Sequence, residues 1–192
     1  MNKNTPKYIV VHHTGGLDAD PLFDSSDRTF SQIDTAHRQD PNVNLGRPSS
    51  LGYYIGYHYY IDKNGILTQG RADTDEGAHC RGYNLLSLGI CLAGNFDRTL
   101  PTDAQVLALR KLLGQKSTQY SIPLTNIQPH RHFASKTCYG NKLADSWAVD
   151  LLKVQAIPAP CTSERETIAE QAAQLGKWRA FLAALKALVN NF

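Results

Sequence analysis

The chain has 192 residues, of which 42% are hydrophobic and 9% aromatic, a composition that favours a folded globule and excludes disordered, collagen-like and coiled-coil proteins. Its length allows one domain plus an appendage. Twenty basic and 17 acidic residues leave a net charge of +3, which is too small a surplus to indicate nucleic acid or an anionic membrane as the main partner.

The N-terminal part of the chain predicts a strand followed by a short helix. Residues 8–12 form an apolar, β-rich run without alternation, which is typical of a strand buried on both faces. Phe30, Ile33 and Ala36 have the spacing of one helix face, and Pro41 stands just beyond it. We therefore expect a helix over residues 30–39.

The middle of the chain predicts a hairpin and a central strand. Residues 53–62 are rich in tyrosine, and a Lys-Asn-Gly turn separates them from a returning strand over residues 66–69. Residues 87–93, SLGICLA, have the apolar character of a strand in the middle of a sheet.

The second half adds two helices and one strand to this pattern. Thr102 and Gln105 form a capping box for a helix that ends near residue 120. A strand over residues 126–130 and a helix over residues 144–154 follow. The alternation of strands and helices, with one antiparallel hairpin, predicts an α/β fold: a mixed central β-sheet flanked by helices on both sides.

The C-terminal part reads as an appendage to this domain. We expect a catalytic domain over residues 1–157, a proline-containing linker over residues 158–162 and an amphipathic helix over residues 163–192. This helix packs on the domain or on a second copy of the chain, or else contacts a membrane through its apolar face. Its apolar residues recur at intervals of seven: Ile168, Leu175, Leu182 and Val189, with Trp178, Leu185 and Phe192 on a second line.

From the sequence we expect no secretory signal at the N-terminus. Its apolar run, Tyr8 to Val11, is too short for one, and no stretch approaches the roughly 20 apolar residues that span a bilayer. We therefore expect synthesis in the cytoplasm, where cysteines are more often thiols or metal ligands than disulfides.

Two histidines and a cysteine could hold a metal ion. His12 ends the first strand, and His130 precedes Cys138 by eight positions. Two imidazoles and a thiolate would suit a catalytic zinc site that leaves its fourth position open. The alternative is ordinary core packing, and strand alternation alone does not choose between His12 and His13 or between His130 and His132. If the segment before Cys138 is extended, the side chains of Lys136 and Cys138 leave it on the same face.

Four motifs together resemble a known family. They are VVHHTGG near the start, then GYHYYIDKNG, GAHCRGYNLLSLGICLAGNFD and PHRHFASKTC. In this order and spacing they are similar to the zinc-dependent N-acetylmuramoyl-L-alanine amidases, which include phage lysozymes of amidase type and the animal peptidoglycan recognition proteins. The resemblance covers residues 8–152, and four motifs in register make a chance match improbable.

This resemblance implies a site and a reaction. By position, the zinc ligands are His12, His130 and Cys138, and the catalytic residues are Tyr57 and Lys136. The implied reaction is hydrolysis, by a zinc-bound water, of the amide between the lactyl group of N-acetylmuramic acid and L-alanine in peptidoglycan. The division of acid and base roles between Tyr57 and Lys136 stays open.

The loop GAHCRGYN borders the cleft in relatives. His79 and Asn84 are therefore candidates for substrate binding, and His79 alternatively for supporting the metal or merely capping the loop. One departure from the family pattern is Tyr139, where relatives usually carry proline. Another is the long segment of residues 18–50, which leaves the shape of the cleft rim undetermined.

The resemblance further implies a biological role. We expect a phage or prophage endolysin that is stored in the cytoplasm and acts on the bacterial cell wall after release. The alternative is a non-hydrolytic module that binds muropeptides; such relatives typically lack the metal-binding cysteine, and this chain has Cys138.

Overall fold

A five-stranded mixed sheet with the order β3-β2-β4-β1-β5 lies at the centre of the computed structural model, which describes residues 3–17, 19–41, 43 and 45–153. Strands β2 and β3 pair antiparallel, whereas β1 pairs parallel with both β4 and β5, and β2 pairs parallel with β4. The mixed sheet predicted from the sequence is therefore confirmed. The strands are β1 (Tyr8–His13), β2 (Tyr59–Ile61), β3 (Leu67–Gln69), β4 (Ser87–Leu92) and β5 (Ile127–Pro129).

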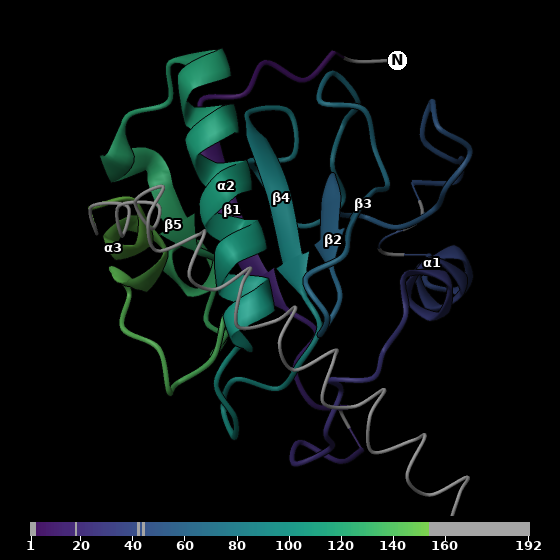
Figure 1. The fold of residues 1–192 in the computed structure, drawn as a ribbon. Coiled ribbons are helices and arrows are strands. Elements are labelled where there is room, and N and C mark those ends of the chain that lie inside the picture. The colour runs from purple at the N-terminus through teal and green to yellow at the C-terminus, as the bar shows by residue number, and fades with distance from the viewer. Residues whose placement is uncertain (1–2, 18, 42, 44, 154–192) are drawn as a thin grey trace, which may run out of the picture. The chain divides into compact units, whose positions relative to one another are not determined.

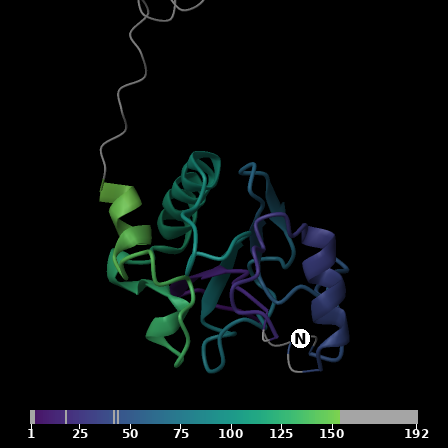
Figure 2. The same ribbon diagram turned by 90° about the horizontal axis from the view of Figure 1, so that it is seen from below.

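Helices cover the two faces of the sheet, as the sequence predicts. Figures 1 and 2 show α2 lying across one face and α1 on the opposite side of the domain, near β2. Both α1 and α2 begin with a capping box, which satisfies backbone N–H groups of the first turn. The helices are α1 (Phe30–Gln39), α2 (Asp103–Tyr120) and α3 (Trp147–Lys153), with 3₁₀ turns η1 (Leu124–Asn126) and η2 (His130–His132).

Alternate residues of the strands divide between two hydrophobic clusters. Ile9 and Val11 of β1 belong to the larger cluster, which includes the buried leucines of α2 and residues of α3. Ile33 of α1 packs in the smaller cluster with Tyr60 and Cys91. The even-numbered side of β1, which carries His12, therefore faces away from α2.

The predicted strand over residues 53–62 is shorter in the structure, and β2 begins only at Tyr59. The reason is that side chains of α1 bind the preceding backbone. Asp34 Oδ1 accepts hydrogen bonds from the N–H groups of Tyr54 and Ile55 at 2.6 and 2.8 Å, and His37 Nδ1 accepts one from Gly56 at 2.8 Å. These donors are thus unavailable for a strand ladder.

Helix α1 has the predicted bounds but a different buried face. Phe30 is partly buried and Ile33 is buried, as expected, whereas Ala36 is exposed. Asp34 and His37 turn towards the protein instead, because they bind the backbone of the neighbouring segment. The buried face of this helix is therefore partly polar.

Several remaining predictions differ at their edges. Helix α3 begins at Trp147 rather than residue 144, and the segment from Lys136 to Cys138 is not extended but part of a series of turns. No helix among the described residues is long and apolar enough to span a membrane. The linker 158–162, the helix 163–192 and Cys161 lie outside the described residues, so the domain division stays a prediction.

Candidate metal centre

The ends of two neighbouring parallel strands bring His12 and His130 together. Strand β1 pairs with β5 so that Val11 is opposite Pro129, and each histidine directly follows its member of this pair. Side chains that follow the carboxyl ends of adjacent parallel strands meet at one edge of the sheet, where α/β folds commonly bind ligands. The rings of His12 and His130 lie 4.5 Å apart between centroids.

Cys138 completes a group of three potential metal ligands. His12, His130 and Cys138 each offer one ligand atom, and these atoms all lie within 4.8 Å of one another. Cys138 Sγ is 3.7 Å from His12 Nδ1. Zinc bonds of about 2.0 Å to nitrogen and 2.3 Å to sulfur at tetrahedral angles place such atoms about 3.5 Å apart. The donor set and its spacing therefore fit zinc.

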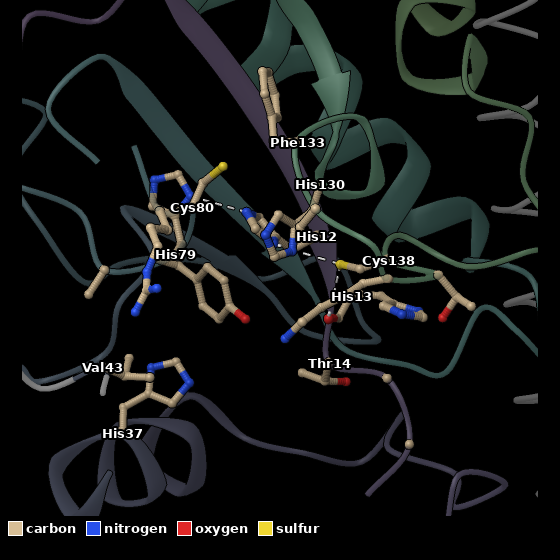
Figure 3. Close-up of a pocket in the computed structure, with 18 of the residues that line it drawn as sticks. His12, His13, Thr14, His37, Val43, His79, Cys80, His130, Phe133 and Cys138 are labelled. Carbon is tan, nitrogen blue, oxygen red and sulfur yellow. Dashed lines mark hydrogen bonds between the residues drawn. The ribbon is translucent and has the colours of Figure 1, made fainter. Parts of the chain in front are cut away.

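The structure also shows which histidine of each pair, His12 or His13 and His130 or His132, belongs to the three-ligand group. His13 Nδ1 accepts a hydrogen bond from the Phe96 N–H at 3.0 Å, and Figure 3 shows the His13 ring directed away from His12 and His130. His132 is exposed, and its ring lies 4.8 Å from that of Phe133. Neither side chain is part of the three-ligand group.

The second nitrogen of His12 faces a chain of hydrogen bonds. His12 Nε2 lies 3.1 Å from His79 Nδ1, and His79 Nε2 lies 3.5 Å from Ser87 Oγ. The Ser87 hydroxyl donates to the Tyr83 carbonyl at 2.7 Å, so it accepts from His79. His79 Nδ1 must then accept from His12 Nε2–H, which leaves His12 Nδ1 without a proton and directed at Cys138.

Two features hold His79 in this position. A Cβ atom at Gly89 would lie 2.5 Å from the His79 ring, so the glycine of β4 makes room for the imidazole. Asn84 Oδ1 accepts hydrogen bonds from the N–H groups of His79 and Cys80 at 3.0 and 2.9 Å. Both sequence-predicted residues, His79 and Asn84, line the cleft, but His79 is buried and its ring nitrogens face protein groups.

The three potential metal ligands and the neighbouring His79 are electrically neutral at neutral pH. Burial lowers the pKa of His12 and His79 well below the usual value, and it lowers the pKa of His130 to about 4. Burial also raises the pKa of the Cys138 thiol to about 12. Neutral imidazoles are ready to bind a metal, whereas the thiol must release its proton on binding.

The three ligands lie in a cleft of about 1010 Å³. Its charged lining residues are Lys136, Arg81 and Asp97. The Asp97 carboxylate is already engaged, since it accepts hydrogen bonds from the Thr137 hydroxyl and the Asn141 N–H, each at 2.8 Å. The positive charge of Lys136 adds to the effect of burial in lowering the pKa of His12 and His130. It acts against burial at Cys138, where burial prevails and the pKa is raised.

Tyr57 lines the same cleft beside the ligands. Its ring centroid lies 5.0 Å from that of His12 and 5.4 Å from that of His37. Burial raises the pKa of the Tyr57 phenol well above its usual value, so the hydroxyl is protonated at neutral pH. Tyr57 and Lys136, which the resemblance pairs as catalytic residues, thus both line the cleft that contains the three potential ligands.

Sequence reasoning missed His37 as a cleft residue. It follows Ile33 by four positions on α1, and this spacing places both side chains on the same face of the helix. That spacing is the sequence signal by which His37 could have been found. Burial lowers the His37 pKa to about 4, which keeps its Nδ1 an acceptor for Gly56. His37 therefore joins helix α1 to the segment that carries Tyr57.

A family profile described as N-acetylmuramoyl-L-alanine amidase matches residues 2–141. An endolysin of Klebsiella phage KP32 is 36% identical over 98 residues, which cover 48% of this chain and 64% of the relative. Peptidoglycan-recognition protein SC2 of Drosophila melanogaster is 30% identical over 142 residues, covering 73% of this chain and 71% of the relative.

Solved structures agree with this assignment. The N-acetylmuramoyl-L-alanine amidase endolysin LysCS of Clostridium intestinale URNW superposes with a TM-score of 0.62 and 29% identity, covering 79% of this chain and 86% of that chain. The chain covers only part of two of its curated relatives, 64% of the length of the Klebsiella phage endolysin and 52% of the length of peptidoglycan-recognition protein 2 of Holotrichia diomphalia. The amidase-like fold predicted from the sequence motifs is confirmed.

Proposed function

Because this chain belongs to the N-acetylmuramoyl-L-alanine amidase family, we propose that it hydrolyses the amide between the lactyl group of N-acetylmuramic acid and L-alanine in peptidoglycan. The observation that carries this proposal is the group of His12, His130 and Cys138 on the wall of a large cleft. Two imidazoles and a thiol leave one tetrahedral position for a reacting ligand.

The metal that suits these ligands is zinc. When bound, zinc would lower the pKa of a coordinated water from about 15.7 towards 7 and polarise the scissile carbonyl. His12 would hold the metal through Nδ1, because its Nε2 proton is committed to His79. Cys138 would have to release its thiol proton to serve as a ligand.

Lys136 and Tyr57 act on the substrate beside the metal ligands. The Lys136 ammonium stabilises the negative charge that develops on the carbonyl oxygen during attack. The Tyr57 phenol, protonated because of its burial, orients the attacking water and is a donor for the leaving amine. This arrangement favours Tyr57 as an acid over Tyr57 as a base.

His79 supports the metal ligand rather than contacting substrate. Its two ring nitrogens face His12 and Ser87, so the imidazole fixes the orientation and tautomer of His12. Asn84 in turn holds the backbone at His79. Of the three roles considered for His79, which were substrate binding, support of the metal and capping of the loop, the hydrogen bonds support the second.

The biological role that fits this activity is that of a phage or prophage endolysin, made in the cytoplasm and acting on the cell wall after release. The phage endolysin relative and the endolysin structure support it. The recognition-protein relatives favour a second candidate, a module that binds muropeptides without cleaving them. The thiol of Cys138 argues for the hydrolase, because a binding module has no need of a third metal ligand.

Digestion of purified peptidoglycan, with and without a chelator, tests the proposal. The hydrolase releases free L-alanine amines paired with lactyl carboxylates, and the chelator stops this release until zinc is restored. Retention of the protein on peptidoglycan without new ends would instead support the binding module. Release of other ends, such as reducing sugars, would refute the amidase assignment.

A further inference from the structure

Arg131 lies between two histidines in sequence, yet its side chain serves the loop that carries Cys138. Its guanidinium donates to three backbone carbonyls of that loop: Nη1 to Gly140 at 2.8 Å and Thr137 at 3.3 Å, and Nη2 to Leu143 at 2.6 Å. Nε donates to the Asp145 carboxylate at 2.5 Å. The guanidinium therefore binds four residues on both sides of Cys138 in the chain.

The backbone of Arg131 makes a further link to the ligand itself. Its N–H donates to the Cys138 carbonyl at 2.7 Å, and Arg131 directly follows His130. One residue thus connects two of the three metal ligands, through the peptide bond to His130 and through a hydrogen bond to Cys138. The guanidinium then fixes the loop on which Cys138 is held.

Tyr139 completes this support from inside the core. Its ring is fully buried and lies 5.4 Å from the Arg131 guanidinium. Its hydroxyl donates to the carbonyls of Ala144 and Asp145 at 3.0 and 2.8 Å. The Arg131 guanidinium and the single Tyr139 hydroxyl proton, shared between two acceptors, thus contact five carbonyls of the loop. The shape of the loop therefore depends on a small number of identifiable groups.

The geometry of these contacts requires arginine. A guanidinium is planar and presents five donors in a rigid fork, whereas a lysine ammonium has three donors on one atom and cannot reach the same set of carbonyls. The ion pair with Asp145 is of less importance, since the Asp145 side chain is 73% exposed and exposed pairs contribute little. The hydrogen bonds to the carbonyls are the part that arginine alone supplies.

We propose that Arg131 is a positioning residue that sets the distance between the Cys138 sulfur and the His130 imidazole before metal binds. The inference rests on the metal site of the proposed function, but it concerns metal binding and not hydrolysis. Without Arg131 the loop samples other shapes, so metal binding must first restore the ligand geometry.

Binding of Co²⁺ to the full-length chain tests this inference, because cobalt absorption reports thiolate ligation and coordination geometry directly. We expect Arg131→Met to bind Co²⁺ about 10–100-fold more weakly, as is usual for supporting residues of metal sites, with a weaker or displaced thiolate-to-cobalt absorption band. Arg131→Lys should fall between the parent and Arg131→Met. Asp145→Asn should remain within about twofold of the parent, because it keeps the carbonyl contacts.

A core variant separates positioning from general stability. Leu113→Ala removes buried contacts of α2, far in sequence from the ligands, and should lower the melting temperature without changing the cobalt spectrum. Parental cobalt affinity and spectrum in Arg131→Met would overturn the inference. If Arg131→Met does not fold, Arg131→Lys decides in the same way. A parent that binds Co²⁺ with a thiolate band but releases no muropeptide ends would refute the amidase and leave this inference standing.

Discussion

The two faces of the central sheet bury very different side chains. On the α2 face, Ile9 and Val11 pack with the leucines of the helix in one continuous apolar cluster. On the opposite face, His12, His58 and His79 are buried with their ring nitrogens directed at other polar groups. The second face also carries the smaller apolar cluster of Ile33, Tyr60 and Cys91, and of the two faces it is the one that includes these buried imidazoles.

The difference separates stability from function. Apolar burial on the α2 face lowers the free energy of the folded state at every pH. Burial of neutral imidazoles on the other face lowers the free energy of unfolding at low pH, because the same histidines take up protons in the unfolded chain but not in the folded one. The α2 face therefore supports the cleft face, and substitutions on the two faces should affect different measurements.

The largest effect should follow removal of the sulfur ligand. Cys138→Ser replaces a thiolate by a hydroxyl, which is a far poorer zinc ligand. We expect zinc affinity to fall by more than about 100-fold, which is the upper end of the loss for a supporting residue, and hydrolysis to stop. Metal analysis after dialysis measures this loss. Cys91→Ala is the matched control, because that buried thiol is not part of the ligand group; equal zinc content in Cys138→Ser and the parent would contradict the ligand assignment.

Loss of the cleft ammonium should affect catalysis and leave the metal bound. Lys136→Ala removes the ammonium that we propose to stabilise developing negative charge, so kcat should fall about 10²–10³-fold. The comparison is with Lys142→Ala, an exposed lysine of the same loop region. Digestion rates and zinc content, measured on both variants, distinguish a loss of catalysis from a loss of metal. If Lys136→Ala cleaves cell walls at the parental rate, Lys136 has no catalytic role.

A substitution on the α2 face should do the reverse. Leu113 is fully buried, and Leu113→Ala should lower the free energy of unfolding by about 2–5 kcal/mol. Zinc affinity and the rate of hydrolysis by the folded enzyme should not change at temperatures where the variant is folded. Leu107, which is 65% exposed, supplies the control, since Leu107→Ala should cost less than about 0.5 kcal/mol. Denaturant titration measures both; a large change in zinc affinity in Leu113→Ala would show that the faces are coupled.

Loss of His79, which supports the potential ligand His12, should have a smaller effect on zinc affinity. His79→Ala removes the acceptor for His12 Nε2, and we expect zinc affinity to fall about 10–100-fold. His132→Ala is matched to it, since it also removes an imidazole but one that is exposed and outside the ligand group. Competition with a zinc chelator gives both affinities. If the two variants bind zinc equally well, the hydrogen bond from His12 to His79 does not hold the ligand.

The smallest effect concerns the pH dependence of stability. Burial lowers the His58 pKa to about 4, whereas in the unfolded chain this histidine takes up a proton near pH 6.5. The unfolded state thus binds more protons below pH 6.5, and the free energy of unfolding falls by about 1 kcal/mol per pH unit for this residue as the pH drops towards 4.

Denaturant titration of the metal-free protein between pH 7 and pH 4.5 would measure this slope. His58→Asn keeps an acceptor for the Gly89 N–H, which His58 Nδ1 binds at 3.0 Å, and should reduce the slope by about one proton. An unchanged slope in His58→Asn would mean that His58 titrates alike in the folded and unfolded chain.

The sequence predicted most of the fold because its signals are local. Apolar runs identified β1 and β4, and the Thr102 and Gln105 pair identified the start of α2. The strand predicted from residue 53 was too long because its tyrosines favour strands, whereas Asp34 and His37 bind the backbone there. Hydrogen bonds between a helix side chain and a segment some 20 positions away leave no local pattern.

The three potential metal ligands could be named from the sequence, but their arrangement could not. The motifs indicated His12, His130 and Cys138, yet only the pairing of β1 with β5 shows why His12 and not His13 faces His130. The contacts of His79 with His12, and of Arg131 with three carbonyls of the Cys138 loop, join residues by their side-chain geometry. Neither residue type nor spacing determines such contacts.

X-ray absorption at the zinc edge of the zinc-loaded, full-length protein is the most direct test of the central claim, that two imidazoles and one thiolate hold the metal. We predict one sulfur scatterer at about 2.3 Å, with nitrogen or oxygen scatterers at about 2.0 Å that carry the signature of two imidazole rings. A zinc ion without a sulfur neighbour would contradict it.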